Sequence, residues 1–205
     1  MDNERLFLGF MGSLAAGSFL WWVQSQLYST YPYQALIDLE STRAIAGQLP
    51  YGEDEFITSA WDFVASGFAY EPTGSVVKFI NGSLRARDVH LPADTLRRGK
   101  ANCLGKSALL ASILRHRLPA ERVWIAIGQL VNGGAKGHVW LETSRGGTFY
   151  ILESTIPPGQ FGWRPAEELR AKYQPEALVN DRERICYSKS LCLVVPKSSV
   201  PCGAC

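Results

Sequence analysis

An apolar helix followed by three short strands, with glycine-rich turns between them, is the pattern that most constrains the fold of this chain. Residues 104–118 carry apolar side chains at helical spacing, place basic residues in the last turn and are stopped by Pro119. Strand patterns separated by turns follow at 122–130, 138–142 and 148–152. A helix followed by an antiparallel meander predicts the α+β class, with the helix packed on the sheet.

The length and composition predict a domain of ordinary size with a substantial core. The chain has 205 residues, of which 46% are apolar and 11% aromatic, so global disorder is not expected. Its net charge is only +2, and its lysine and arginine residues are scattered apart from a short group at 97–100. Because no basic stripe is visible, nucleic acid is not expected as the main partner.

Changes in composition along the chain predict three segments. Residues 1–47 hold an apolar helix and a linker, residues 48–180 the main domain, and residues 181–205 a tail that contains cysteines. Helical patterns run around 35–49 and over 53–68, and the second of them ends before a Tyr70-Glu-Pro turn. The other expected elements are a connection at 88–98, a charged helix around 165–173 and an edge strand at 191–195.

Residues 6–23 form an uncharged run of 18 positions that ends in Trp21-Trp22. This length is at the low edge of a membrane span, and paired tryptophans are typical of the membrane interface. Glycine and serine dilute the hydrophobicity, so a helix that is buried in the protein or docks on it is the alternative. A signal peptide fits worse, because the leading residues are not basic and no cleavage site stands out. The protein is therefore expected to be membrane-associated through residues 6–23 or cytoplasmic.

Cys103 is the candidate nucleophile. It stands alone in the middle of the chain, whereas the other four cysteines lie after residue 185. At the start of the predicted helix, the exposed backbone N–H groups and the helix dipole favour a thiolate, and Lys100 and Lys106 add positive potential. The same N–H groups are suited to one side of an oxyanion hole. The alternative interpretation is a buried structural cysteine.

A Gly-Lys-Ser run at 105–107 superficially resembles a phosphate-binding loop. That motif requires a second glycine five residues upstream, at position 100, but this chain has Lys100 there and its glycine at Gly99. No apolar strand leads into the run either. Nucleotide binding is therefore not expected at this site.

A histidine and a carboxylate follow on two predicted strands. His138 opens a strand after Gly137 and shares one strand face with Trp140 and Glu142, and Glu153 closes the next apolar strand. A carboxylate at that position is suited to orient an imidazole, although Glu142 or Asp88 is an alternative partner. The two other histidines, His90 and His116, are expected to be exposed to solvent.

The order of these motifs resembles the transglutaminase-like superfamily of thiol enzymes. The matching pieces are the Tyr70-x-Pro exit, GKANCLGKSALLASILR around Cys103, GHVWLE around His138 and FYILEST around Glu153, which span roughly residues 50–160. The resemblance implies a papain-like α+β fold, to which the uncharged run at residues 6–23 adds an N-terminal apolar helix. It also implies Cys103 as the nucleophile, His138 as the base and Glu153 as the orienting acid. This chemistry requires no metal or organic cofactor.

Two features depart from the family pattern. The acid of that family is usually aspartate, and Glu153 is one methylene longer. The family also usually has an acidic residue shortly after the cysteine, where this chain has Gly105 and Lys106. Candidates for an oxyanion donor or for substrate contact are Trp61, Tyr70, Asn102 and Trp140.

Four cysteines near the end of the chain offer an alternative metal site, namely Cys186, Cys192, Cys202 and Cys205. They would form either a zinc site or two disulfides, but their spacing matches neither common zinc pattern. The terminal Cys-Gly-Ala-Cys is also a poor version of a prenylation signal. A tail with ordinary thiols is the simpler interpretation, so no metal site is assigned.

Two hypotheses for the function follow. In the first, Cys103 attacks an amide carbonyl of a protein or peptide substrate and forms a thioester, which water resolves in a peptidase, amidase or deamidase. Resolution by an amine would give protein cross-linking instead. In the second hypothesis, the domain is a non-catalytic transglutaminase-like module for binding or assembly.

Overall fold

The computed structural model describes residues 29–72, 78–80, 83–86, 89–131, 135–160 and 163–187. The helices are η1 (Tyr33–Leu36), α2 (Leu39–Gln48), α3 (Glu53–Gly67), α4 (Pro92–Arg98), α5 (Cys103–Leu114), η2 (Ala120–Arg122) and α6 (Ala166–Leu169). The strands are β1 (Ser29–Tyr31), β2 (Ala69–Tyr70), β3 (Lys78–Ile80), β4 (Ser83–Ala86), β5 (Lys100–Ala101), β6 (Val123–Val131), β7 (Ala135–Arg145), β8 (Thr148–Leu152), β9 (Arg164–Pro165), β10 (Tyr173–Val179) and β11 (Arg184–Cys186).

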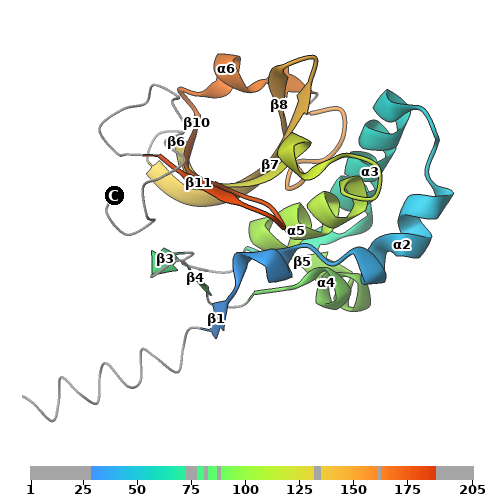
Figure 1. Cartoon of the computed structure of the whole chain (residues 1–205), viewed down its shortest axis with the longest axis horizontal. Helices are drawn as coiled ribbons and strands as arrows, with labels where there is room; N and C mark the ends of the chain where they lie inside the picture. The colour runs from blue at the N-terminus through green and yellow to red at the C-terminus, as the bar shows by residue number, and fades with distance from the viewer. Residues whose placement is uncertain are drawn as a thin grey trace, which may run out of the picture.

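A six-stranded antiparallel sheet forms one layer, and its strand order is β11-β10-β6-β7-β8-β9. The helices α2, α3, α4 and α5 form the other layer, with α5 next to the sheet (Figure 1). Two small sheets lie outside this arrangement, one of β1, β4 and β3 and one of β2 and β5. The predicted α+β class, with the helix of Cys103 packed on an antiparallel sheet, is therefore confirmed.

The helix α5 is buried along its whole length after its first residue. It contacts β6 and β7 on one side and α2, α3 and α4 on the other. A helix that is covered by protein on all sides can be apolar all round, which explains why the sequence here has no polar face. The packing fixes Cys103, the first residue of α5, where the sheet and the helical layer meet.

The sheet has an apolar core on each face, as the alternation of side chains along its strands requires. Ile125, Val139 and Leu141 face the main core with α3 and α5. Trp124 and Trp140, from the same two strands, face a smaller core that includes Tyr173 and Ala166.

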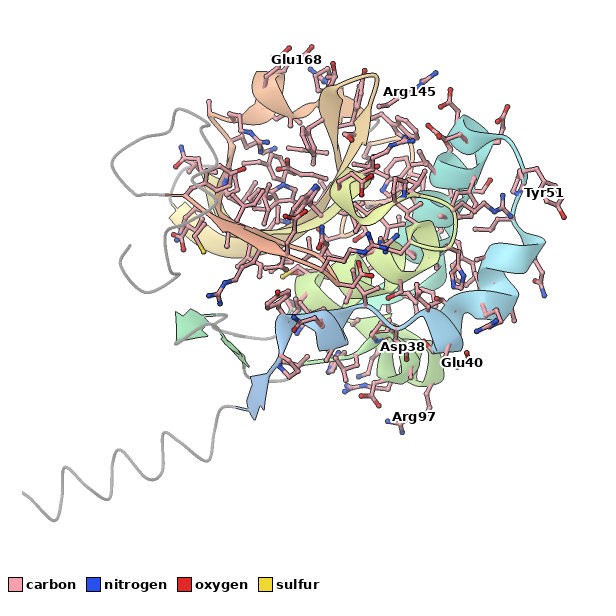
Figure 2. All side chains as sticks on the ribbon, in the orientation of Figure 1. Asp38, Glu40, Tyr51, Arg97, Arg145 and Glu168 are labelled. Atoms are coloured by element: carbon pink, nitrogen blue, oxygen red, sulfur yellow. The ribbon has the colours of Figure 1, made fainter. Side chains whose placement is uncertain are left out.

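The helix α3 follows the expected amphipathic pattern closely. Its first turn holds three acidic residues, and its buried face includes Phe56, Ala60, Trp61 and Val64. Figure 2 shows Arg145 beside the start of this helix, where its guanidinium pairs with Asp54 at 2.8 Å. The helix α3 is thereby tied to the end of β7, the strand that carries His138.

Several elements differ from the sequence-based expectations. Residues 92–98, expected to lie in a connection, form α4, because Pro92 suits the first helical turn and Gly99 ends the helix with φ of 66°. The charged helix expected around 165–173 is only the short α6. The strands β10 and β11 were not expected; pairing with β6 and packing of Leu178 and Tyr173 in the smaller core stabilise them.

The expected apolar helix at 6–23 and the edge strand at 191–195 lie outside the described residues. Within the residues that the structure does describe, no helix has the length and apolarity needed to cross a membrane. Residues 33–48 pack on the main core, to which Leu36 and Ala46 contribute.

Candidate active site

Cys103 is held at the first position of α5 by the residues that precede it. Asn102 is the N-cap, and its side-chain oxygen accepts a hydrogen bond of 2.9 Å from the backbone N–H of Gly105. The thiol of Cys103 is free and partly exposed. The capped helix start therefore presents a thiol beside backbone N–H groups at the positive end of the helix dipole.

His138 and Glu153 form a direct pair beneath the surface. The imidazole Nε2 lies 2.7 Å from Oε2 of Glu153, and the two side chains are 10% and 1% exposed. His138 is the fourth residue of β7 and not the first, since the strand begins at Ala135. Glu153 lies directly after β8, which pairs with β7.

Every oxygen of Glu153 has a partner. Oε1 accepts hydrogen bonds from the backbone N–H and the hydroxyl of Thr155, at 2.9 and 2.7 Å. The backbone carbonyl accepts a bond of 3.0 Å from the indole N–H of Trp61 on α3. A buried carboxylate needs such partners, and they fix its second oxygen toward the imidazole.

The thiol of Cys103 lies near enough to His138 to affect the pKa of the imidazole. Burial lowers the pKa of His138, but hydrogen bonds to Cys103 and Glu153, together with their charges, outweigh it and raise the pKa to about 10. Burial raises the pKa of Glu153, but the bond to His138, its charge and Thr155 hold it below its usual value of 4.5. The imidazole is therefore protonated and the carboxylate ionised at neutral pH.

Aromatic rings cover the inner side of the imidazole. Trp140 stacks on His138 with ring centroids 6.1 Å apart, and Tyr173 packs edge-on against Trp140 at 5.3 Å. The indole N–H of Trp140 donates to Glu142, whose carboxylate is paired with Arg170 at 2.5 Å. Trp140 is fully buried beside the imidazole.

The four residues predicted as oxyanion donors or substrate contacts have different environments in the structure. Trp61 is bound to the carbonyl of Glu153, Asn102 caps α5 and Trp140 is buried. Tyr70 is 44% exposed and lies in β2, which pairs in parallel with β5 just before Cys103. Burial, followed by the charges of Cys103 and Glu153, raises the pKa of Tyr70 to about 12, so its hydroxyl remains a donor.

The other acids and histidines are placed elsewhere. Glu142 pairs with Arg170 and not with His138, and Asp88 lies outside the described residues. His90 is buried rather than exposed, because α4 and α5 cover it and its Nε2 lies 2.6 Å from Arg98. His116 is partly buried, with Nε2 3.1 Å from the hydroxyl of Thr42.

Of the four tail cysteines, Cys186 is described and is disulfide-bonded, whereas Cys192, Cys202 and Cys205 lie outside the described residues. Among the described residues, no group of three His, Cys, Asp or Glu side chains is arranged to hold a metal ion.

Sequence reasoning missed three supporting residues: Thr155, Arg170 and Tyr173. The Ser-Thr pair directly after Glu153 was a usable signal, since hydroxyl side chains commonly bond a neighbouring carboxylate. Neither of the other two had a local signal: Tyr173 reaches the site through the pairing of β10 with β6, and Arg170 reaches Glu142 from the end of α6.

Comparisons with known proteins show the fold. No protein-family model and no curated protein matches the chain. The calcium-bound structure of Legionella pneumophila LapG is similar at 17% identity and a TM-score of 0.51, covering 82% of this chain and 94% of that one. The EGTA-treated LapG structure has 16% identity and a TM-score of 0.49, covering 77% and 89%. A candidate cysteine protease from Cytophaga hutchinsonii has 16% identity and a TM-score of 0.40, covering 65% and 44%. The calcium-bound LapG structure and the antiparallel sheet with its central helix fit a papain-like α+β fold.

Proposed function

We propose that this protein is a thiol-dependent enzyme that hydrolyses amide bonds in a protein or peptide substrate. Cys103 is the nucleophile, His138 the general base and acid, and Glu153 the residue that orients the imidazole. The observation that carries the proposal is the pair of Glu153 and His138, whose facing atoms are 2.7 Å apart, together with the effect of the nearby Cys103, which raises the pKa of the imidazole. A cysteine, an imidazole and a carboxylate in this order are the parts of an activated thiol nucleophile.

In the first step the thiolate of Cys103 attacks the carbonyl carbon of the scissile amide. A C–S bond forms, the C–N bond breaks, and the imidazolium of His138 gives its proton to the leaving nitrogen. The products are a thioester on Cys103 and a free amine. Glu153 stays ionised throughout, because its Oε1 accepts two hydrogen bonds from Thr155 while Oε2 faces the imidazole.

In the second step water attacks the thioester. His138 takes the proton from the water, the C–S bond breaks, and the carboxylic acid leaves while the thiolate is restored. We favour water over an amine acceptor, because Cys103 is partly exposed and water needs no dedicated binding site. Cross-linking would require a site that holds the amine.

Negative charge develops on the carbonyl oxygen in both steps. We propose that the backbone N–H of Cys103 at the start of α5 is one donor to this oxygen. Tyr70 is our candidate for the second donor, since it is half-exposed beside β5 and its hydroxyl stays protonated.

Alkylation with iodoacetamide tests the nucleophile without knowledge of the substrate. Iodoacetamide reacts with thiolates, and an ordinary thiol, which has a pKa of about 8.5, reacts slowly at about pH 6. A cysteine that His138 activates should react faster. We expect mass spectrometry to find Cys103 alkylated well before any other free cysteine. The replacement His138→Ala should abolish this preference.

The competing hypothesis, a non-catalytic module, predicts the opposite results. If Cys103 reacts no faster than the tail cysteines, and His138→Ala changes nothing, the enzyme hypothesis is wrong. If Cys103 is selectively reactive, incubation with a mixture of peptides in ¹⁸O-labelled water separates the two outcomes of acyl transfer. Hydrolysis places ¹⁸O in new carboxylates, whereas transfer to lysine leaves no label.

A further inference from the structure

Lys106 is a buried charge that the reaction does not use. It lies on α5 three positions after Cys103, and its side chain is only 1% exposed. Its ammonium group donates hydrogen bonds to the carbonyl oxygens of Phe68 at 2.8 Å and Ala65 at 3.1 Å. Burying a lysine costs free energy because its charge loses contact with water, so we expect Lys106 to have a function.

The two carbonyl groups belong to the end of α3. This helix ends at Gly67, with Phe68 as its C-cap, and the last carbonyls of a helix lack partners within it. A cation at this end also interacts favourably with the helix dipole. Desolvation lowers the pKa of Lys106 to about 8, although the charge of Glu153 opposes that shift.

The chain runs from Phe68 directly into β2 and Tyr70. The backbone N–H of Ala69 donates to the carbonyl of Gly99 at 3.0 Å, and that of Glu71 donates to Ala101 at 2.9 Å. These bonds attach β2 to the segment that precedes Cys103. The ammonium group of Lys106 fixes the same stretch from within the protein, at the residue where α3 passes into β2.

We propose that Lys106 is a positioning residue that sets the location of Tyr70 relative to Cys103 by binding the end of α3. This inference rests on the proposed function, in which Tyr70 donates to the oxyanion. Cys103 and Lys106 lie on the same helix. The hydrogen bond from Lys106 to Phe68 therefore fixes the start of β2 relative to Cys103. Displacement of a catalytic group by about 1 Å can cost about 100-fold in rate.

Two reactions of Cys103 separate positioning of Tyr70 from activation of the thiol. Alkylation by iodoacetamide forms a C–S bond, releases iodide and develops no oxyanion. Acetylation by p-nitrophenyl acetate passes through a tetrahedral oxyanion; the C–O bond breaks, the acetyl group joins the sulfur and p-nitrophenolate leaves. A residue that serves only the oxyanion therefore affects the second reaction alone.

The variants are Lys106→Met, Lys106→Gln and Tyr70→Phe in the full chain. We expect each to lower the rate of the p-nitrophenolate burst by about 10- to 100-fold, while the alkylation rate changes less than about twofold. The double variant Lys106→Met, Tyr70→Phe should be no slower than Tyr70→Phe alone, because both act on one donor. Ser112→Ala is the matched control, since Ser112 is a buried polar residue farther along α5 that bonds Asp38 and Ala108.

Each outcome decides the inference. It is overturned if a folded Lys106 variant keeps the wild-type burst, if alkylation falls as much as acetylation, or if the effects of Lys106→Met and Tyr70→Phe multiply. Failure of both Lys106 variants to fold overturns it as well, since Lys106 would then be a purely structural residue. If wild-type Cys103 neither reacts selectively with iodoacetamide nor gives a burst, the proposed function fails instead.

Discussion

Glu153 is fixed from three directions at the scale of single side chains. Thr155 holds one carboxylate oxygen, Trp61 holds the backbone carbonyl, and the remaining oxygen faces Nε2 of His138 at 2.7 Å. The additional methylene relative to aspartate is therefore accommodated by the position of the residue directly after β8. Shortening this side chain should matter only if the distance from its carboxylate to the imidazole of His138 is important for activity, which mutation can test.

Glu153→Gln should lower the rate of Cys103 acylation by about 10²- to 10⁴-fold. The amide nitrogen facing Nε2 would make that atom an acceptor, so the proton would sit on Nδ1 instead. Glu153→Asp keeps the charge but shortens the reach, and a smaller loss is expected. Burst kinetics with p-nitrophenyl acetate measures both, and equal rates for wild type and Glu153→Gln would contradict the orienting role.

The pair of His138 and Glu153 should also make stability depend on pH. The folded-state pKa of His138 is raised from 6.5 to about 10, so its contribution is complete below 6.5 and is lost as the pH rises toward 10. The pKa of Glu153 is lowered from 4.5, so its contribution is present above 4.5 and is lost as the pH falls. The pair therefore stabilises the fold most between these two ordinary values.

Urea unfolding of wild type and His138→Gln over this range measures the effect. The difference in free energy of unfolding between the two should shrink as the pH rises from about 6.5 to about 10. The difference is the proper quantity, because the lowered pKa of Lys106 favours the folded state as pH rises above 8 and would mask the trend in wild type alone. A difference that stays constant over this range would contradict the assigned pKa shift.

At the scale of elements, α3 links the helical layer to the site through Trp61. Trp61→Phe keeps the ring in the core but leaves the buried carbonyl of Glu153 unpaired, which should cost about 1–3 kcal/mol of stability. It should also reduce acylation of Cys103, because Glu153 loses one of its supports. Trp124→Phe is the matched control: its indole N–H bonds the carbonyl of Glu121 and not that of Glu153, and its ring shares the smaller core with Trp140. The unfolding temperature should fall for both variants, but acylation of Cys103 should slow only in Trp61→Phe. Slower acylation in both would show that the loss does not come from the bond between Trp61 and Glu153.

Gly105 lets α5 approach β5 and the segment before α4. A Cβ at this position would lie 2.8 Å from Cβ of Ala101, 3.0 Å from Cβ of His90 and 3.1 Å from its carbonyl oxygen. Gly105→Ala should therefore destabilise the protein by about 1–3 kcal/mol. Gly47→Ala, at an exposed position of α2 with nothing within 4 Å, should stabilise it by about 0.4–1 kcal/mol. Chemical denaturation tests both signs, and a neutral Gly105→Ala would mean that Ala101 and His90 can move away from α5 without cost.

At the scale of the whole molecule, the site draws one side chain from each of three places: the start of α5, the strand β7 and the residue after β8. The layers meet at this point, and the bonds of Trp61 and Lys106 connect α3 to the sheet and to α5. Activity should therefore depend on how the layers are held together as well as on the three reacting side chains.

Membrane association through residues 6–23 stays a prediction. We expect the full chain to sediment with membranes, and a chain lacking residues 1–27 to remain in the supernatant, because the uncharged run would supply the apolar surface. Both chains should show the same selective alkylation of Cys103, which controls for folding. A full chain that stays in the supernatant would exclude the anchor.

Local patterns predicted the central elements because their periodicity is a property of neighbouring residues. The spacing of Phe56, Ala60 and Val64 identified α3, and the apolar alternation of 148–152 matches β8. The strand β10 was missed because its stability comes from pairing with β6, more than 40 residues earlier in the chain. The burial of His90 was missed for the same reason, since α4 and α5 cover it only in the folded protein.

The sequence by itself predicted that a helix would begin at or just after Cys103, and that a histidine and two acids would follow on adjacent strands. It favoured Glu153 as the partner of His138 but left Glu142 and Asp88 as alternatives. Tertiary structure decided this: Arg170, from a distant segment, pairs with Glu142, while the register of β7 and β8 brings Glu153 to the imidazole. Only tertiary structure gave Lys106 its partners, because the carbonyl groups that its ammonium binds belong to the end of α3, about 40 residues earlier in the chain.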